Sequence, residues 1–460
     1  QTPVYDLTVT EQGLHLASES GFYHLSPEGE ILKCQLPDGE HSAVYRLFKD
    51  SQQGSWISTY RKLFYRQHRQ EWQTVTTAEL GTTPWFSDVF EDKQQNIWLA
   101  SYSDGIYRAA AGHVRRLVDG LADPVVRSVG LTPDDELIIA SQSALQTLNK
   151  SGEFTTLLGA EIMGSQTIHD FFWPESQLLW FGADSGLLQY NLKTRELSVP
   201  FPSLQGNTIK VVQPAVDGGV WLGGVRGLYY SSDKQLTLSP LNEQFESRNI
   251  TALQHKTDQL FVGTTRGLYQ YQQDKLQRLG VGNALYNSYI LALLHLPDGS
   301  LLVSTIDDGI FIRRPEQQWL QLHTGNGMPH GPAVSFSYDE VDQQVWVSSH
   351  KGIYRLALAT LPESSNQPFI IDEVLTPFDR QLGSGPNRCC NGAGHAKIVQ
   401  WQDEYWFPTL KGLIAVQANL KQTSEQPLKP QIKQVTTSQQ YQLTQGQQQL
   451  VLEMDERNVR

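Results

Sequence analysis

The chain has 460 residues, of which 39% are apolar and 18% charged, a composition that favours folded domains with a hydrophobic core over disorder. Its 36 Lys and Arg residues against 48 Asp and Glu residues give a formal charge of −12, so no overall positive field would attract nucleic acid. Three cysteines are too few for a disulfide scaffold or a cysteine-rich zinc site, and no stretch approaches the ~20 apolar residues of a membrane span.

One sequence pattern recurs along nearly the whole chain. Residues 96–108 read NIWLASYSDGIYR and residues 220–229 read VWLGGVRGLY, and the two stretches align on a turn glycine. The pattern returns about every 41 residues, which is the length of a four-stranded propeller blade. The copies place the glycine, or the residue that replaces it, at Gly21, Lys62, Gly105, Ala144, Gly186, Gly227, Gly267, Gly309, Gly352 and Gly412.

Each copy predicts four short strands. In the copy around Gly267, apolar runs at 250–253, 259–263, 267–271 and 276–279 are separated by polar turns. Helical spacing is not sustained anywhere, so the sequence predicts an all-β chain. Stacking the sheets radially covers both apolar faces of each, which gives a β-propeller of about ten four-stranded blades. The tryptophan that recurs at one strand position is expected to fill the space between blades, at Trp56, Trp98, Trp180, Trp221 and Trp346.

The repeats also predict the domain organisation. Residues 1–124 hold three repeats, and residues 125–420 hold seven repeats with an insertion at about 364–397. Two groupings are open: one seven-bladed ring preceded by part of another, which we favour, or one wide ring.

The repeated pattern, with Trp, a small residue, a turn glycine and Tyr, resembles the two-component-regulator propeller repeat. That repeat occurs in periplasmic sensors of bacterial hybrid histidine kinases and of some diguanylate cyclases, and the resemblance runs from about Val4 to Val416. The segment at 421–460, with PLKPQI and VLEMDERNVR, resembles a linker and the first strands of the immunoglobulin-like triple-tyrosine (Y_Y_Y) domain that follows such propellers. The resemblance implies a membrane helix and a cytoplasmic output module beyond it. On this resemblance the chain would be an extracytoplasmic sensor fragment. Its start at Gln1 without Met predicts a processed product or a piece of a longer protein.

Candidate ligand-binding residues lie in the turns between the second and third strands of the blades. In a propeller these turns open on the same face as the entries to the first strands. Polar residues dominate hairpin turns for structural reasons as well, so the face is a firmer prediction than any one residue on it. The candidates form a mixed polar ring suited to hydroxyl-rich or charged small ligands, with Lys62 beside the principal set of Tyr102, Asp104, Asp184, Arg226, Arg266, Asp307, Asp308, His350, Lys351 and Lys411.

The insertion contains RCCNGAGHAK at 388–397, the one non-repetitive segment whose side chains could carry redox or metal-binding chemistry. Cys389 and Cys390 are adjacent, so either a vicinal disulfide or two ordinary thiols is possible. His395 follows closely, but this set lacks the spacing of known zinc sites, so we expect neither a metal nor a cofactor.

The sequence carries no motif of a hydrolase, a phosphate-binding loop or a zinc protease, so we expect no enzyme activity in this region. His169 and Asp170, on the first strand of a repeat, are expected to be structural and hydrogen-bonded. The favoured hypothesis is a periplasmic ligand-binding sensor domain of a membrane signalling protein, with an oligosaccharide or other small polar molecule as ligand. A homodimer is expected in the full-length receptor, with the membrane reached only through a C-terminal helix. A propeller-fold polysaccharide lyase or other glycan-acting enzyme and a protein-binding scaffold are the alternatives.

Overall fold

The computed structural model describes residues 2–375, 389–390 and 397–418, apart from short gaps at 11–12, 40, 52–53, 61, 67–71, 76–84, 93–95, 103–104, 110–113, 165, 233–234, 257, 316 and 330. The predicted triple-tyrosine segment at 421–460, Asp104 and His395 lie outside the described residues. Within the described part, no helix has the length and apolar character needed to cross a membrane.

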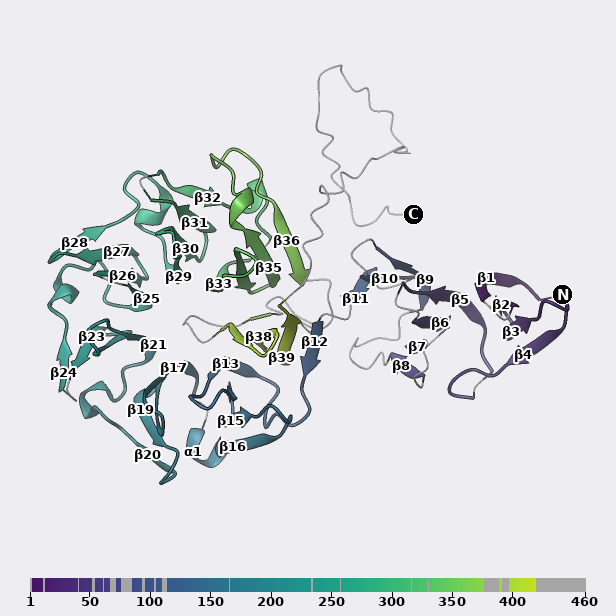
Figure 1. Ribbon diagram of the computed structural model, residues 1–460, viewed down its shortest axis with the longest axis horizontal. Coiled ribbons are helices and arrows are strands. Elements are labelled where there is room, and N and C mark those ends of the chain that lie inside the picture. Colours follow the sequence, from purple (N-terminus) through teal and green to yellow (C-terminus); the bar gives the residue numbers. More distant parts are fainter. Residues whose placement is uncertain are drawn as a thin grey trace, which may run out of the picture. The chain divides into compact units, whose positions relative to one another are not determined.

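Seven four-stranded antiparallel sheets form a ring (Figure 1). In six of them the first strand in sequence lies nearest the centre of the ring and the fourth lies at its periphery. These sheets are β13 (Val126–Leu131), β14 (Leu137–Ser141), β15 (Leu145–Leu148) and β16 (Phe154–Leu158); β17 (Ile168–Glu175), β18 (Leu178–Ala183), β19 (Gly186–Asn191) and β20 (Glu196–Ser198); β21 (Ile209–Pro214), β22 (Val220–Gly224), β23 (Gly227–Ser232) and β24 (Gln235–Leu238); β25 (Ile250–Lys256), β26 (Gln259–Thr264), β27 (Gly267–Gln272) and β28 (Lys275–Arg278); β29 (Ile290–His295), β30 (Leu301–Thr305), β31 (Ile310–Arg313) and β32 (Leu320–Leu322); β33 (Ala333–Asp339), β34 (Gln344–Ser349), β35 (Gly352–Ala357) and β36 (Ile371–Leu375). The all-β propeller that the repeats predict is confirmed.

The seventh sheet closes the ring with strands from two distant parts of the chain. It consists of β37 (Val399–Trp401), β38 (Glu404–Thr409), β39 (Gly412–Gln417) and, on the outside, β12 (Val114–Leu117). β12 pairs with β39 from Val114 opposite Val416 to Leu117 opposite Leu413. The ring therefore includes a strand that precedes residue 125, and β36 forms within the segment predicted as an insertion.

The closing strand is held by side chains as well as by the backbone. Arg115 donates from Nε and Nη2 to the two carboxylate oxygens of Glu404, at 2.8 and 2.7 Å. The Arg115 guanidinium also lies 4.7 Å from the centre of the Trp406 ring. A bidentate pair of this kind fixes the geometry of both partners.

Three further sheets precede the ring in sequence. They are β1 (Val4–Thr10), β2 (Gly13–Ser18), β3 (Gly21–Leu25) and β4 (Ile31–Cys34); β5 (Val44–Lys49), β6 (Ser55–Thr59), β7 (Leu63–Arg66) and β8 (Gln73–Val75); and β9 (Phe86–Glu91), β10 (Ile97–Ser101) and β11 (Ile106–Ala109). The first strands β1, β5 and β9 contact one another in that order. We call these the N-terminal sheets.

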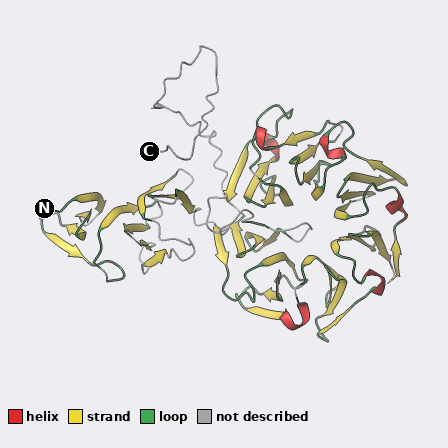
Figure 2. Cartoon of the chain, turned by 180° about the vertical axis from the view of Figure 1, so that it is seen from behind, coloured by secondary structure: helices red, strands yellow, loops and turns green. Residues whose placement is uncertain are grey.

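In the described residues, helical structure is limited to single turns, most of them in the connections between successive sheets of the ring (Figure 2). They are α1 (Ala160–Met163), η2 (Pro202–Leu204), η3 (Pro240–Glu243), η4 (Ala284–Tyr286), η5 (Thr324–Asn326) and η6 (Leu358–Thr360). Several begin with a side-chain cap, as where the Asn283 side chain accepts from the backbone N–H of Leu285.

The hydrophobic core lies between the blades. Successive residues of a strand point to opposite faces of its sheet, so a strand buried on both faces is apolar throughout. In β14, Leu137 and Ile139 pack against Trp406 of the preceding blade, whereas Ile138 and Ala140 join the cluster formed with the following blade. Of the recurring tryptophans, Trp56, Trp180 and Trp346 belong to such clusters and Trp221 packs against one, whereas Trp98 is half-buried and belongs to none of them. Trp346 is fully buried with its ring centre 4.7 Å from that of Tyr405.

Neighbouring inner strands are also joined by buried polar side chains. The Asp170 carboxylate accepts from the backbone N–H of Val212 at 2.8 Å, one blade further on. Ser128 Oγ donates to the carbonyl of Ile168 at 2.6 Å in the same way. Asp170 therefore has the structural role expected for it, because it satisfies a buried backbone donor.

The turn glycines are required by the hairpins. Gly309 has φ +81°, and a Cβ at this position would lie 2.1 Å from the carbonyl oxygen of Leu322. Only glycine meets both conditions, the positive φ and the close approach of the backbone.

Candidate functional site

The turns between second and third strands lie on the edge of each blade where its first strand begins. The antiparallel register requires this, because the start of β21 pairs with the end of β22 and the end of β22 pairs with the start of β23. The first residue of each turn is tied to that edge: the backbone N–H of Asp184 donates to the carbonyl of Thr167, and that of His350 donates to Pro332. We call the strand starts at 125–128, 167–169, 208–210, 249–251, 289–291 and 332–334, together with these turns, the ring mouth.

A β-bulge lies at the start of the inner strands and sets which side chains reach the mouth. In β13, Val126 pairs with Ser141 and Ser128 with Ala140, so Arg127 has no partner in the ladder. The same register shift leaves out His169 in β17 and Lys210 in β21. Bulges re-aim side chains and are frequent next to functional sites.

The identity of the bulged residue divides the ring mouth into two parts. Three consecutive blades carry the basic residues Arg127, His169 and Lys210 there, and the next three carry Thr251, Leu291 and Val334. One side of the mouth is therefore basic and the other uncharged at this position.

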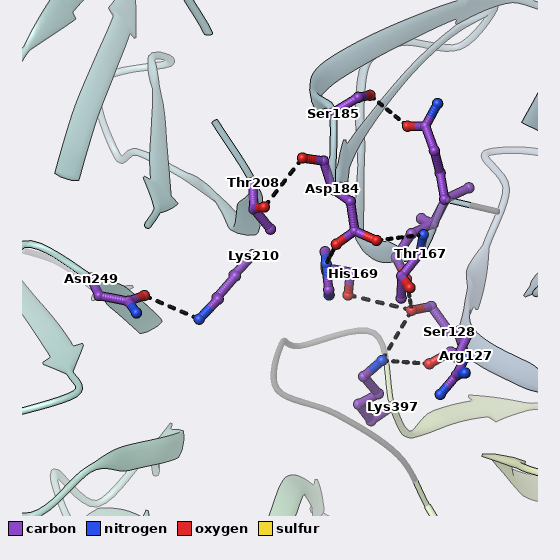
Figure 3. A network of polar contacts seen from close by, with 12 residues as sticks. Arg127, Ser128, Thr167, His169, Asp184, Ser185, Thr208, Lys210, Asn249 and Lys397 are labelled. Atoms are coloured by element: carbon purple, nitrogen blue, oxygen red, sulfur yellow. Dashed lines mark hydrogen bonds and ion pairs between the residues drawn. The ribbon is translucent and has the colours of Figure 1, made fainter. Parts of the chain in front are cut away.

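His169 is hydrogen-bonded to Asp184 at the mouth (Figure 3). His169 Nε2 and Asp184 Oδ1 are 2.9 Å apart, and the other carboxylate oxygen accepts from the backbone N–H of Thr167 at 2.9 Å. Burial lowers the pKa of His169, although its hydrogen bond to Asp184 acts in the opposite direction. For Asp184, burial acts to raise the pKa, but the hydrogen bonds from His169 and Thr167 outweigh it and the pKa is lowered. At neutral pH the pair is thus a carboxylate and a neutral imidazole whose Nε2–H we assign as the donor.

Two lysines, Lys210 and Lys397, lie near the pair of His169 and Asp184 (Figure 3). Lys210 Nζ donates to Asn249 Oδ1 of the next blade at 3.0 Å, and burial lowers its pKa. Lys397 Nζ donates to the carbonyl of Arg127 and to Ser128 Oγ, the latter at 3.1 Å (Figure 3). Lys397 is fully buried, and burial lowers its pKa to about 7. Among the described residues, the buried Nε of Arg127 has no hydrogen-bond partner.

The accessible part of this network combines both signs of charge. The side chain of Asp184 is 47% exposed, whereas that of His169 is 16% exposed. An ammonium has three donors and a carboxylate about four acceptor positions, so the hydrogen bonds described above leave capacity at Lys210 and Asp184. The arrangement can therefore hydrogen-bond hydroxyl, carboxylate and amine groups of a small ligand.

The structure distributes the other predicted residues around the turns. Arg226, Asp307 and Lys411 are exposed, and Lys351 is half-buried. Arg266 pairs with Glu246 at 3.8 Å. Asp308 accepts from Ser288 Oγ, which gives it a structural partner within its own blade.

His350 and the cysteines belong to the side of the ring between the sixth and seventh blades. Burial lowers the pKa of His350, and its carbonyl accepts from the backbone N–H of Cys389 at 3.0 Å. Cys389 and Cys390 form a disulfide with each other and are buried against Trp346 and Tyr405. No group of three His, Cys, Asp or Glu side chains that could hold a metal ion occurs in the described residues.

Of the described residues in the predicted set, only Asp184 belongs to the polar network at the mouth. Tyr102 lies in the N-terminal sheets, stacked on Trp85. Sequence reasoning missed Arg127, Lys210 and Lys397 as site residues, because a bulge and a contact across 270 residues of chain leave no local pattern. His169 is hydrogen-bonded, as its position in the sequence predicts. Its partner is Asp184, while Asp170 bonds to the next blade.

No protein-family model and no curated protein matches the chain. Its fold is similar to those of two extracellular domains from B. thetaiotaomicron, BT3049 and BT4673, each assigned as a hybrid two-component system. The first has a TM-score of 0.56 at 15% identity over 91% of this chain and 56% of that domain, and the second has 0.51 at 14% identity over 92% and 59%. The chain thus spans less than three fifths of either neighbour. The propeller resemblance seen in the repeat is confirmed at the level of the fold.

Proposed function

We propose that this chain is a ligand-binding region of an extracytoplasmic sensor, and that the ring mouth binds a small polar ligand, such as an oligosaccharide. The observation that carries the proposal is the network of His169, Asp184 and Lys210 on two consecutive blades. Its groups are partly desolvated, carry both signs of charge and retain hydrogen-bonding capacity. Sites for small molecules place a few such polar groups in a concave, largely preformed surface.

The solved structures of similar fold support the sensor part of the proposal. Both are extracellular domains of proteins assigned as hybrid two-component systems. By analogy, this chain would lie outside the cytoplasmic membrane, in the periplasm, and pass its bound state to a signalling module of the same protein. Ligand binding does so when it favours one arrangement of domains or protomers over another.

Thermal unfolding of the chain against a compound panel tests this proposal. The panel contains neutral and acidic oligosaccharides and amino acids, and ultraviolet absorbance and reducing ends are followed in the same wells. A ligand that binds only the folded state stabilises it by about 2.7 kcal/mol at 100 times its Kd, so the midpoint rises with concentration. A concentration-dependent rise without product supports a sensor.

Variants locate the binding. Lys210→Met and Asp184→Asn should abolish the ligand-induced rise because each removes one polar contact of the mouth. Lys193→Met is the matched control, since Lys193 is exposed in the turn between β19 and β20, on the opposite edge of the blade. An equal rise in all variants would place the ligand elsewhere and refute the ring mouth as the site.

One observation favours a glycan-acting enzyme as a second candidate. His169 is a neutral imidazole beside a carboxylate, which is a common arrangement for a general base. Lys397 does not add to it, because its amine is buried and engaged by Arg127 and Ser128. Product formation that is lost in His169→Gln would establish the enzyme and displace the sensor proposal.

A further inference from the structure

Five aromatic side chains form one continuous group across the three N-terminal sheets. Tyr5 stacks on Tyr45 with ring centres 5.0 Å apart, and Tyr45 lies 5.0 Å from Trp85. Trp85 in turn contacts Tyr60 at 5.2 Å and stacks on Tyr102 at 4.2 Å. We call these five residues the aromatic cluster.

The aromatic cluster occupies the same edge of its blades as the ring mouth does in the ring. Tyr5 and Tyr45 are the bulged second residues of β1 and β5, the position that His169 has in β17. Tyr102 is the first residue of its turn, as Asp184 is, and its backbone N–H donates to the carbonyl of Trp85 at 3.0 Å. Where the ring presents charged groups, the N-terminal sheets present aromatic rings.

The cluster is not a buried core. Tyr102, Tyr60 and Tyr5 are 69%, 49% and 41% exposed. Burial raises the pKa of Tyr45, and the nearby Tyr5, Glu19, Tyr60 and Tyr102 raise it further. The surface therefore offers flat apolar faces edged by hydroxyl groups.

A pocket of about 410 Å³ adjoins the cluster and shares Tyr60 with it. Its other lining residues are Leu36, Asp38, His41, Ser42, Thr59, Lys62 and Phe64. Lys62 Nζ pairs with Asp38 at 2.6 Å, which neutralises both charges. The pocket thus supplies hydroxyl, carboxylate and ammonium groups without a net charge.

We propose that the aromatic cluster and this pocket form a second ligand site, which binds a neutral oligosaccharide. A sugar ring has flat faces of C–H groups that pack on aromatic rings, and a rim of hydroxyls that both donate and accept hydrogen bonds. The exposed rings here are tyrosines with polar tips and not aliphatic side chains, which suits a hydroxyl-rich ligand better than an apolar protein segment. Glu19 beside the cluster disfavours a polyanionic chain. The site is independent of the ring mouth.

Isothermal titration calorimetry of the full chain tests the proposal, with maltohexaose, cellohexaose, xylohexaose and mannohexaose as probes and choline as a cationic probe. We expect at least one hexaose to bind and Tyr102→Ala to weaken it about tenfold. Tyr102→Phe keeps the stacking ring and should stay within threefold of the wild type. Phe90→Ala is the matched control, because Phe90 is 62% exposed near the opposite end of β9 from Trp85.

Four results would overturn the proposal. They are the absence of binding by every hexaose at 10 mM, an unchanged Kd in Tyr102→Ala, an equal loss in Phe90→Ala, and binding of choline alone. Tyr60→Ala provides a second test at the border with the pocket, and it should weaken the same hexaose. If only choline binds and Tyr102→Ala removes it, the cluster is a cation site.

Discussion

Lys397 should make the stability of the protein depend on pH in a way that one substitution removes. The lysine reaches across the ring closure to the carbonyl of Arg127 and to Ser128 Oγ. Burial lowers its pKa from 10.5 to about 7, the Asp170 carboxylate acts against this, and Arg127 adds to it. The folded protein therefore releases a proton that the unfolded chain keeps.

The sign and size of the effect follow from proton linkage. Between pH 7 and pH 10.5 the unfolded state binds more protons, so the free energy of unfolding rises with pH, by up to about 1.4 kcal/mol per pH unit. From pH 7 to pH 9 the contribution of Lys397 amounts to about 2 kcal/mol. Below pH 7 both states bind the proton and the contribution is constant.

Urea unfolding of the wild type and of Lys397→Met, followed by tryptophan fluorescence at pH 7, 8 and 9, measures this contribution. The free energy of unfolding of the wild type relative to Lys397→Met should increase by about 2 kcal/mol over this range. Lys193→Met, at an exposed site, should differ from the wild type by the same amount at every pH. Parallel pH profiles for the wild type and Lys397→Met would refute the account of the buried lysine.

Three further predictions concern the architecture. A chain that begins at residue 113 keeps β12, and its ring should unfold at the same temperature as in the full chain. A chain that begins at residue 122 exposes the edge of β39 and should unfold at a lower temperature in calorimetry. Equal Tm values for the two shortened chains would contradict closure by β12. Asp170→Ala leaves the N–H of Val212 buried without its partner and should lower the free energy of unfolding in urea by about 1–3 kcal/mol, and no change would refute the link between blades. Gly218→Ala places a side chain at a positive φ with open space around it and should lower the free energy of unfolding by about 1 kcal/mol. Gly309→Ala also brings its Cβ against the carbonyl of Leu322 and should lower it by at least about 2 kcal/mol more. Equal losses in urea unfolding would show that the backbone moves to relieve this contact.

The repeat was readable from sequence because its determinants are local. A hairpin that needs a positive φ selects glycine at one position, as at Gly227, and a strand buried on both faces is apolar throughout, as in β14. The apolar strands return in every copy and the glycine in all but the two copies with Lys62 and Ala144, so the fold class could be predicted from them. The strand that closes the ring could not be predicted, since Val114 pairs with Val416 and neither segment carries a local sequence signal for this pairing.

The polar network at the ring mouth could be predicted only in part, for the same reason. Asp184 was found because turn residues are recognisable in sequence. His169 is bound to it only through the register of β17 and β18, and the approach of Lys397 to Arg127 depends on closure of the ring. Turn position alone also included Asp308, whose side chain is bound to Ser288.

The most direct test of the central claim is calorimetric titration of the chain with the panel compound that raises its Tm most and whose effect is lost in the ring-mouth variants. The account predicts saturable binding with one site, a Kd at least tenfold weaker in Lys210→Met and in Asp184→Asn, and no product after binding. An unchanged Kd in both variants would contradict the assignment of the site, and turnover of the compound would contradict the sensor function.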